Sequence, residues 1–238
     1  MKNQWHKNAE MSIIEHLEEL RSRIFIAFVS FSIITIICFI YTKDISYLLQ
    51  QPAFGIKFLQ LAPGEYLFAS IKIAIYTGFL ISSPFTLYQI ILFILPGLTK
   101  KEASLLIPII ASSILLFFVG ILFSYKILIP NALQFLIQYG SDVVEPIWSF
   151  GEYFNFVLLL LISTGLSFQI PIIQVVLGIY NIISAEDMLS YWKYMLFIST
   201  IIGAILTPST DPITQILMSS AIFSLYLIGI IILKFINK

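Results

Sequence analysis

The chain has 238 residues, of which 59% are apolar and only 11% are charged, and its formal net charge is zero. This composition excludes the water-soluble protein classes, and a neutral chain lacks the basic excess with which proteins attract nucleic acid. We therefore expect an integral membrane protein that interacts with the lipid bilayer and has no nucleic-acid partner.

Long apolar runs with few charges recur along the whole chain. A run of ~18 or more such residues is typical of a transmembrane helix, because a helix satisfies every backbone polar group within the segment. The runs cover residues 24–41, 71–95, 105–129, 153–180, 193–207 and 213–233. We predict an all-α membrane protein with six transmembrane helices in a single polytopic domain, residues 1–238. The last two helices should be short, since ~15 residues reach only ~22 Å.

The segment before the first run has the pattern of a helix that meets the membrane surface. Ser12 and Glu15 form a capping box, and the apolar residues that follow recur at helical spacing. We expect an interfacial amphipathic helix over residues 12–23 that leads straight into the first span.

The longest connection, residues 43–70, mixes proline and glycine, including Pro52, with apolar residues. This mixture predicts a structured cap over the outer ends of the spans. Prolines within the apolar runs, at Pro84, Pro108 and Pro171, predict bent helices.

Orientation follows from the distribution of lysine and arginine. If the N-terminus lies on the cytoplasmic or stromal side, that side carries nine of these residues and the opposite side carries four. Such an excess marks the inner side. Both termini are therefore expected there, and residues 43–70 form an extracytoplasmic cap.

Acidic residues stand at two places on the inner side. Glu18 and Glu19 lie opposite the apolar stripe of the first helix, and Arg23 follows Glu19 by one helical turn. Glu102 ends a second capping box that begins at Thr99. One interpretation is a solvated polar face and a helix cap. The other is a pair of carboxylates that bind cationic groups, for which arginine is suited by its planar fork of donors.

Two further polar residues are candidates for a structural or functional role. Gln169 stands alone in the middle of the fourth run and is either an amide that packs helices together or a polar group in a cavity. Asp211 precedes Pro212 and is most simply a turn residue. The only histidines are His6 and His16, and no cluster has metal-ligand spacing. We therefore predict no enzyme activity, no metal and no cofactor.

Several motifs together resemble the TatC family, the multi-span receptor subunit of the twin-arginine protein translocase. The resemblance extends from about Ser12 to Leu233 and depends on the order of its motifs. These are His16-Leu17-Glu18-Glu19-Leu20-Arg21-Ser22-Arg23, Ser83-Pro84-Phe85 with Tyr88-Gln89, Phe93 to Glu102, Phe168-Gln169-Ile170-Pro171, and Leu206-Thr207-Pro208 with Asp211-Pro212 and Gln215.

The resemblance implies a receptor that binds signal peptides with two consecutive arginines on folded cargo. It also implies self-association and recruitment of single-span TatA- and TatB-type partners for export driven by the proton motive force, in a bacterial plasma membrane or a plastid thylakoid membrane. By residue match, Glu19 and Glu102 would bind the arginines, and Leu20, Arg21 and Phe93 would shape the site. Matches with structural or partner-contact roles are Pro52, Pro84, Tyr125, Gln169 and Asp211.

Two departures from the family pattern stand out. Gln169 occupies a position where the family commonly has glutamate, and Tyr226-Leu227 replaces an aromatic-acidic pair. The alternative functions are a small secondary transporter with a midplane polar site around Gln169 and Asn155, and a structural membrane scaffold. No internal repeat supports a transporter.

Overall fold

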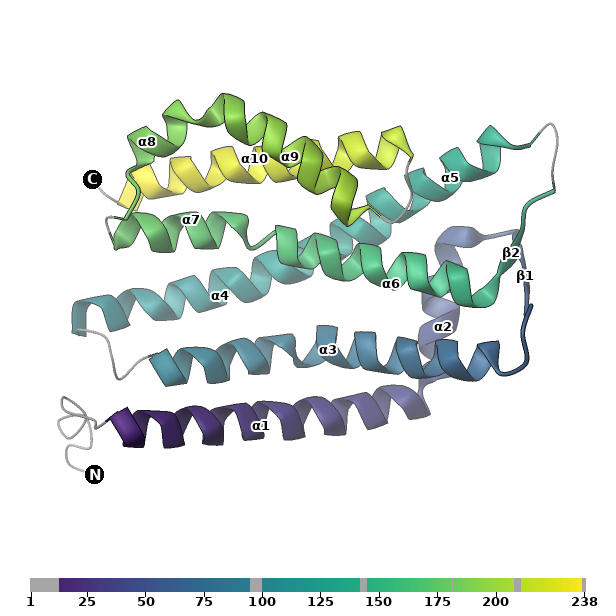
Figure 1. Ribbon diagram of the computed structural model, residues 1–238, viewed down its shortest axis with the longest axis horizontal. Helices are drawn as coiled ribbons and strands as arrows, with labels where there is room; N and C mark the ends of the chain where they lie inside the picture. Colours follow the sequence, from purple (N-terminus) through teal and green to yellow (C-terminus); the bar gives the residue numbers. More distant parts are fainter. Residues whose placement is uncertain (1–12, 95–99, 142–144, 181, 208–210, 237–238) are drawn as a thin grey trace.

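The structure, a computed structural model, describes residues 13–94, 100–141, 145–180, 182–207 and 211–236. Within these ranges, long helices lie side by side and a small two-stranded sheet lies at one end (Figure 1). Five helical segments of the described chain are long and apolar enough to cross a membrane, and a further apolar helix is shorter. The prediction of an all-α membrane protein with six spans is confirmed.

The spans are formed by the following elements: α1 (Ile13–Ile40); α3 (Glu65–Ile94); α4 (Lys100–Phe123), a π-helical turn (Ser124–Leu128) and α5 (Ile129–Tyr139); α6 (Phe150–Ser167) and α7 (Ile170–Ile179); α9 (Trp192–Leu206); and α10 (Pro212–Ile236). The shorter elements are α2 (Thr42–Gln50), a 3₁₀ turn (Gln51–Ala53), β1 (Lys57–Leu59), β2 (Ile147–Ser149) and α8 (Ala185–Ser190).

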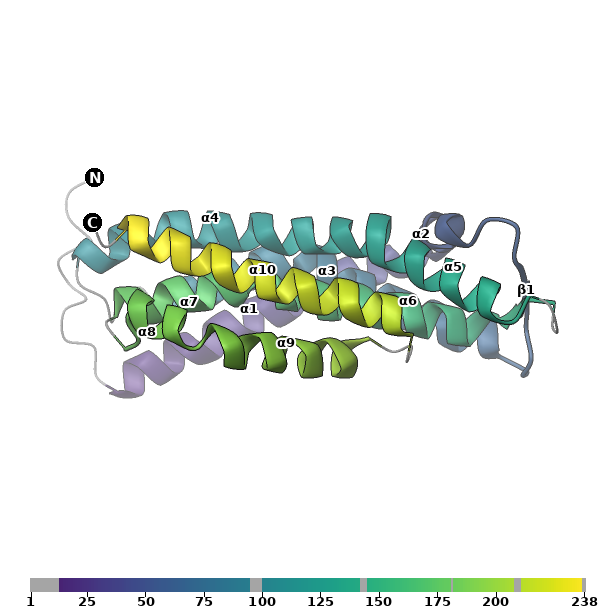
Figure 2. The ribbon, with the colours of Figure 1, turned by 90° about the horizontal axis from the view of Figure 1, so that it is seen from above.

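Helix α1 begins, and α10 ends, at the same end of the molecule (Figures 1 and 2). We call it the inner end, following the lysine and arginine distribution. Helix α3 ends and α4 begins there too, so the two predicted acidic segments lie at one end of the bundle. Helix α1 is continuous from Ile13 to Ile40, so residues 13–23 lead straight into the first span. Ser12 lies outside the described residues.

The combined α6–α7 span forms the centre of the bundle, because it contacts α3 and α4 through α6 and α10 through α7. In an apolar stretch of 18 residues of the α6–α7 span, 56% of the residues are buried, whereas in the corresponding stretch of α1 only 6% are buried. Phe154, Val157 and Leu161 are buried in the main core. Helix α1 packs chiefly against α3 and leaves most of its apolar surface for lipid.

The bends that proline predicts have local causes. Pro84 cannot donate to the carbonyl of Leu80, and the Ser83 hydroxyl donates to that carbonyl instead, at 2.8 Å. The fourth span is interrupted between α6 and α7, where Pro171 lies in the first turn of the new helix. The third span contains the π-helical turn directly before Pro130.

The expected shortness of the last two helices holds for α9 only. Helix α9 has 15 residues, about 22 Å, whereas α10 has 25 residues, about 37 Å. The expectation for α10 was wrong because its apolar run, residues 213–233, already has 21 residues and spans about 32 Å. The helix also continues past this run to Lys234, whose long side chain is exposed at the inner end.

The outer end carries a cap that joins two loops. Strands β1 and β2 pair in parallel, with Phe58 opposite Trp148. Glu65 accepts four hydrogen bonds from both loops: the Ser149 hydroxyl, the Gly151 N–H at 2.8 Å, and the N–H groups of Leu61 at 2.6 Å and Ala62 at 3.2 Å. The carboxylate therefore holds the start of α3 against the start of α6.

Candidate functional site

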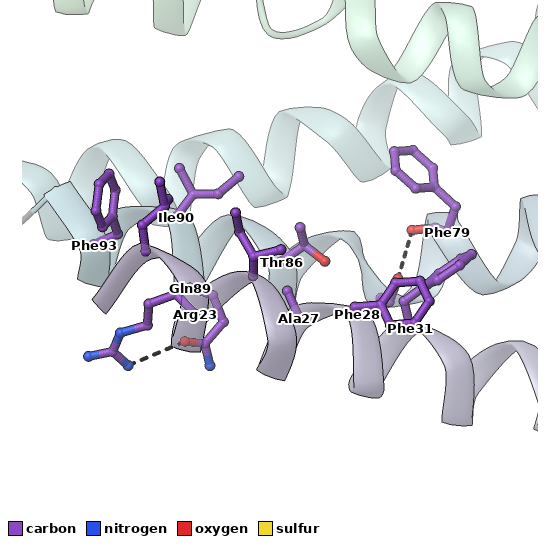
Figure 3. Close-up of a pocket in the computed structure, with 12 residues that line it drawn as sticks. Arg23, Ala27, Phe28, Phe31, Phe79, Thr86, Gln89, Ile90 and Phe93 are labelled. Atoms are coloured by element: carbon purple, nitrogen blue, oxygen red, sulfur yellow. Dashed lines mark hydrogen bonds between the residues drawn. The ribbon is translucent and has the colours of Figure 1, made fainter. Parts of the chain in front are cut away.

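An apolar groove between α1 and α3 opens at the inner half of the molecule (Figure 3). Its volume is about 580 Å³. The lining residues are Leu20, Arg23, Ile24, Ala27, Phe28 and Phe31 from α1, and Phe79, Ser82, Thr86, Gln89, Ile90 and Phe93 from α3. Only Arg23, Ser82, Thr86 and Gln89 among them are polar. Arg23 and Gln89 lie toward the inner end of the groove, beside Phe93 (Figure 3).

A close approach of the two helices lies on the outer side of this groove. Gly78 of α3 packs against Thr35 of α1, and a Cβ added at Gly78 would lie 3.0 Å from the Thr35 Cα. Only glycine allows the backbones to come this near, as in other small-residue contacts between membrane helices. The contact sets the register that places Arg23 opposite Gln89.

Arg23 joins the two helices at the groove's inner end. Its Nη2 donates to Glu19 Oε1 at 3.2 Å, and its Nη1 donates to Gln89 Oε1 at 3.3 Å (the latter is drawn in Figure 3). The side chains of Arg23 and Glu19 are 29% and 18% exposed. The predicted one-turn pairing of Glu19 and Arg23 therefore forms, and it is withdrawn in part from water.

The second carboxylate oxygen of Glu19 has an unusual environment. Glu19 Oε2 is buried and has no hydrogen-bond partner among the described residues. A buried acceptor without a partner costs roughly 1–3 kcal/mol, and more when it is charged. The site therefore has an unused acceptor that a guanidinium or ammonium group could satisfy, directly beside a position where a guanidinium already lies.

Aromatic and apolar residues border the acidic site. The rings of His16 and Phe93 stack with centroids 4.3 Å apart, which places Phe93 over the first turn of α1. Leu20 lines the groove. Arg21 is exposed, and it is not among the groove-lining residues. Of the three residues expected to shape the site, the structure brings Leu20 and Phe93 to it.

Glu102 lies in the first turn of α4, which begins at the same inner end as α1. Its side chain lies outside the part of the chain that the structure describes. The pairing of Glu19 with Glu102 therefore stays a prediction. Among the described residues, no three His, Cys, Asp or Glu side chains come together in a way that could hold a metal ion.

Gln169 packs helices together. Its amide nitrogen donates to the carbonyl of Ser113 on α4 at 3.1 Å, and its amide oxygen accepts from the Ser113 hydroxyl at 2.5 Å. Asn155 is exposed on α6 and lies 14 residues earlier, roughly 20 Å along the helix axis. The two do not form the shared midplane site that the transporter alternative requires.

The other matched residues occupy structural positions. The Tyr125 hydroxyl, in the π-helical turn, donates to the Leu48 carbonyl at 2.7 Å and to Gln51 Oε1 at 3.2 Å, and Pro52 follows in the 3₁₀ turn. Asp211 caps α10, because its Oδ1 accepts from the Thr214 N–H at 2.7 Å. Asp211 thus caps α10, whereas residues 208–210 of its expected turn lie outside the described residues, so the interpretation as a turn residue stays a prediction.

Sequence reasoning missed two residues that the structure makes important. Gln89 was noted only within a motif, and its partner Arg23 belongs to another helix. The available signal was an amide side chain in an apolar run, which seeks a partner between helices. Glu65 was missed because its four donors come from loops whose pairing cannot be read from local spacing.

Comparison with known proteins gives consistent matches over nearly the whole chain. The family model described as "Sec-independent protein translocase protein (TatC)" matches residues 15–220. The "Uncharacterized tatC-like protein ycf43" of Gracilaria tenuistipitata var. liui is 68% identical over 97% of both chains. The "Sec-independent protein translocase protein TatC" of Synechocystis sp. is 52% identical over 97% of this chain and 91% of its own.

A solved structure shares the architecture. The "Crystal Structure of Twin Arginine Translocase Receptor- TatC" superposes with a TM-score of 0.80 at 38% identity. It covers 94% of this chain, and all of the solved chain is matched.

Proposed function

The chain belongs to the Sec-independent protein translocase protein (TatC) family, and from this premise we propose that it is the receptor subunit of a twin-arginine translocase, in which Glu19 and Glu102 bind the paired arginines of a signal peptide. It is an integral membrane protein, and its relatives include cyanobacterial and chloroplastic proteins. The membrane is accordingly a bacterial plasma membrane or a thylakoid membrane. The chain acts by binding and recruiting, not by catalysing a reaction.

One observation carries this proposal. Glu19 already accepts a hydrogen bond from one guanidinium, and its other oxygen is buried without a partner among the described residues. An acidic group with spare acceptor capacity at the inner end suits an arginine of an incoming peptide, because charge-assisted hydrogen bonds to guanidinium are among the strongest in proteins. Glu102 would supply a second carboxylate from α4 for the neighbouring arginine.

The groove offers a place for the apolar part of the same peptide. It begins at Arg23 and Gln89 and continues along α1 and α3 past Phe28 and Phe31. A signal peptide whose arginines lie at Glu19 would have its following apolar residues at the mouth of this groove. After binding, TatA- and TatB-type single-span partners and further copies of the receptor assemble for export driven by the proton motive force.

The test measures binding of an Arg-Arg signal peptide and its Lys-Lys counterpart to the purified full chain in lipid nanodiscs. We expect the Lys-Lys peptide to bind about tenfold or more weakly, because lysine lacks the bidentate fork. Glu19→Gln and Glu102→Gln should each weaken binding of the Arg-Arg peptide by more than about tenfold.

Glu18→Gln is the matched control. Glu18 is the exposed neighbour of Glu19, so its substitution removes the same charge from the same turn of helix. It should change the affinity by less than about threefold, as expected of an exposed charge. Equal binding of both peptides, or equal effects of Glu18→Gln and Glu19→Gln, would refute the proposal.

A further inference from the structure

The guanidinium of Arg23 lies against Oε1 of Glu19, one of the two carboxylate oxygens at which a signal-peptide arginine is proposed to bind. A peptide arginine that binds both oxygens therefore has to displace Arg23. We infer that Arg23 is an internal competitor, a residue that sets the affinity of the site by holding Glu19 until a peptide arginine displaces it. The inference rests on the proposed function, since it needs Glu19 to be a binding residue.

The geometry of the contact is that of a replaceable partner. Arg23 gives Glu19 one hydrogen bond of 3.2 Å and gives Gln89 one of 3.3 Å. Charge-assisted hydrogen bonds are commonly 2.7–2.9 Å long, and a paired arginine and carboxylate often make two of them. Arg23 therefore uses only part of the binding capacity of Glu19, and no other group in the described part of the chain donates to Oε2.

An incoming arginine can improve on this arrangement. It approaches from outside the helix and is not limited by the one-turn spacing that ties Arg23 to Glu19, so it can address both carboxylate oxygens. The Gln89 amide oxygen, which lines the same groove, becomes available to the newcomer when Arg23 leaves. One guanidinium thus takes the place of another, and no buried acceptor is left without a donor.

An internal competitor affects all ligands equally. The free energy needed to move Arg23 away from Glu19 does not depend on which peptide replaces it. The competitor therefore weakens Arg-Arg and Lys-Lys peptides by the same factor and leaves their ratio unchanged. At a given peptide concentration, a weak ligand such as the Lys-Lys peptide then leaves the receptor unoccupied, whereas the Arg-Arg peptide still binds.

The competing explanation is that Arg23 only clamps α1 to α3. The two explanations predict opposite signs. A clamp positions Glu19, so its loss should weaken peptide binding. A competitor blocks Glu19, so its loss should strengthen binding.

The experiment uses Arg23→Met in the full chain in nanodiscs, because methionine keeps an unbranched apolar stem and removes every donor. Affinity for both the Arg-Arg and the Lys-Lys peptide should rise about fivefold, the value for removing one positive charge ~4–5 Å from the ligand in water-like surroundings. Arg23→Lys keeps the charge and loses the fork, so it should raise both affinities by a smaller factor, about twofold.

Lys234→Met is the matched control, since Lys234 is an exposed cation at the same end of the bundle. It should leave both affinities within about twofold. Unchanged or weaker binding by Arg23→Met overturns the inference, and if that variant does not insert, unchanged or weaker binding by Arg23→Lys does so. Glu19→Gln separates the two claims: if it leaves binding intact, the proposed function itself fails, whereas loss of binding together with no gain from Arg23→Met refutes only the competitor.

Discussion

The contact between Gly78 and Thr35 allows a quantitative test of how α1 is held. Gly78→Ala would place a Cβ 3.0 Å from the Thr35 Cα and less than 3.0 Å from its hydroxyl oxygen. Relief of the hydroxyl overlap requires α1 to move outward by about 1 Å, since comfortable contacts are about 3.5 Å or longer. Overpacking of this kind costs about 1–3 kcal/mol. We expect Gly78→Ala to lower the free energy of unfolding by that amount.

The double mutant of Gly78→Ala with Thr35→Ala tests whether the overlap with the Thr35 hydroxyl causes this loss of stability. Thr35→Ala removes the hydroxyl, which is buried and has no hydrogen-bond partner within the described ranges, so alone it should be nearly neutral. In the Gly78→Ala background it leaves only contacts of 3.0 Å to Cα and 3.1 Å to Cβ, which a shift of about 0.5 Å relieves. The two changes should therefore couple, with the second recovering about half of the loss.

The assay is reversible unfolding in mixed micelles for the four proteins of the cycle. Gly140→Ala is the control, because a Cβ there meets nothing within 4 Å and the residue lies at the end of α5. It should be neutral or slightly stabilising. If Gly78→Ala is as harmless as Gly140→Ala, or if Thr35→Ala fails to couple with it, the close approach of α1 and α3 does not set their register.

Substitutions at three further positions test the structural assignments by the same unfolding assay. Gln169→Leu removes both hydrogen bonds to Ser113 and should cost about 1 kcal/mol, as typical of polar contacts between membrane helices, without abolishing peptide binding; a loss of binding at unchanged stability would contradict a packing role. Asp211→Ala should lower the free energy of unfolding by about 0.5–2 kcal/mol, because α10 loses its cap. Asp211→Asn keeps the acceptor and should lower it much less, and equal losses for the two variants would contradict the capping role. Tyr153→Phe removes the hydrogen bond of 2.6 Å to the Leu49 carbonyl and should lower the free energy of unfolding by about 1–2 kcal/mol. A protease should also cleave the cap of the variant sooner than that of the unmodified protein, and equal cleavage of both would show that this bond does not hold the cap.

The features of the fold that could be predicted depend on local properties of the chain. Apolar length located the spans, and Pro171 marked the interruption of the fourth span because proline disrupts the helix in which it stands. The pairing of β1 with β2 could not be predicted, since three-residue strands have too little pattern and their partners lie about 90 residues apart. The length of α10 was underestimated because a length of ~15 residues, which fits α9, was also assigned to a run of 21 residues that spans about 32 Å.

The contacts of the candidate site also differ in whether local properties of the chain predict them. Glu19 and Arg23 are one helical turn apart, so their contact follows from the period of a single helix. The Gln89 contact depends on the register between α1 and α3, which is set where Gly78 packs against Thr35. Gly78 is 11 residues from Gln89 and Thr35 is 12 residues from Arg23, so no local sequence pattern links the two contacts. A glycine in an apolar run is the only trace that such a contact leaves in the sequence, and glycines are common in membrane helices for several reasons. For this reason the contact of Arg23 with Glu19 could be predicted from the chain alone, whereas the contact of Arg23 with Gln89 is found only once the two helices are placed together.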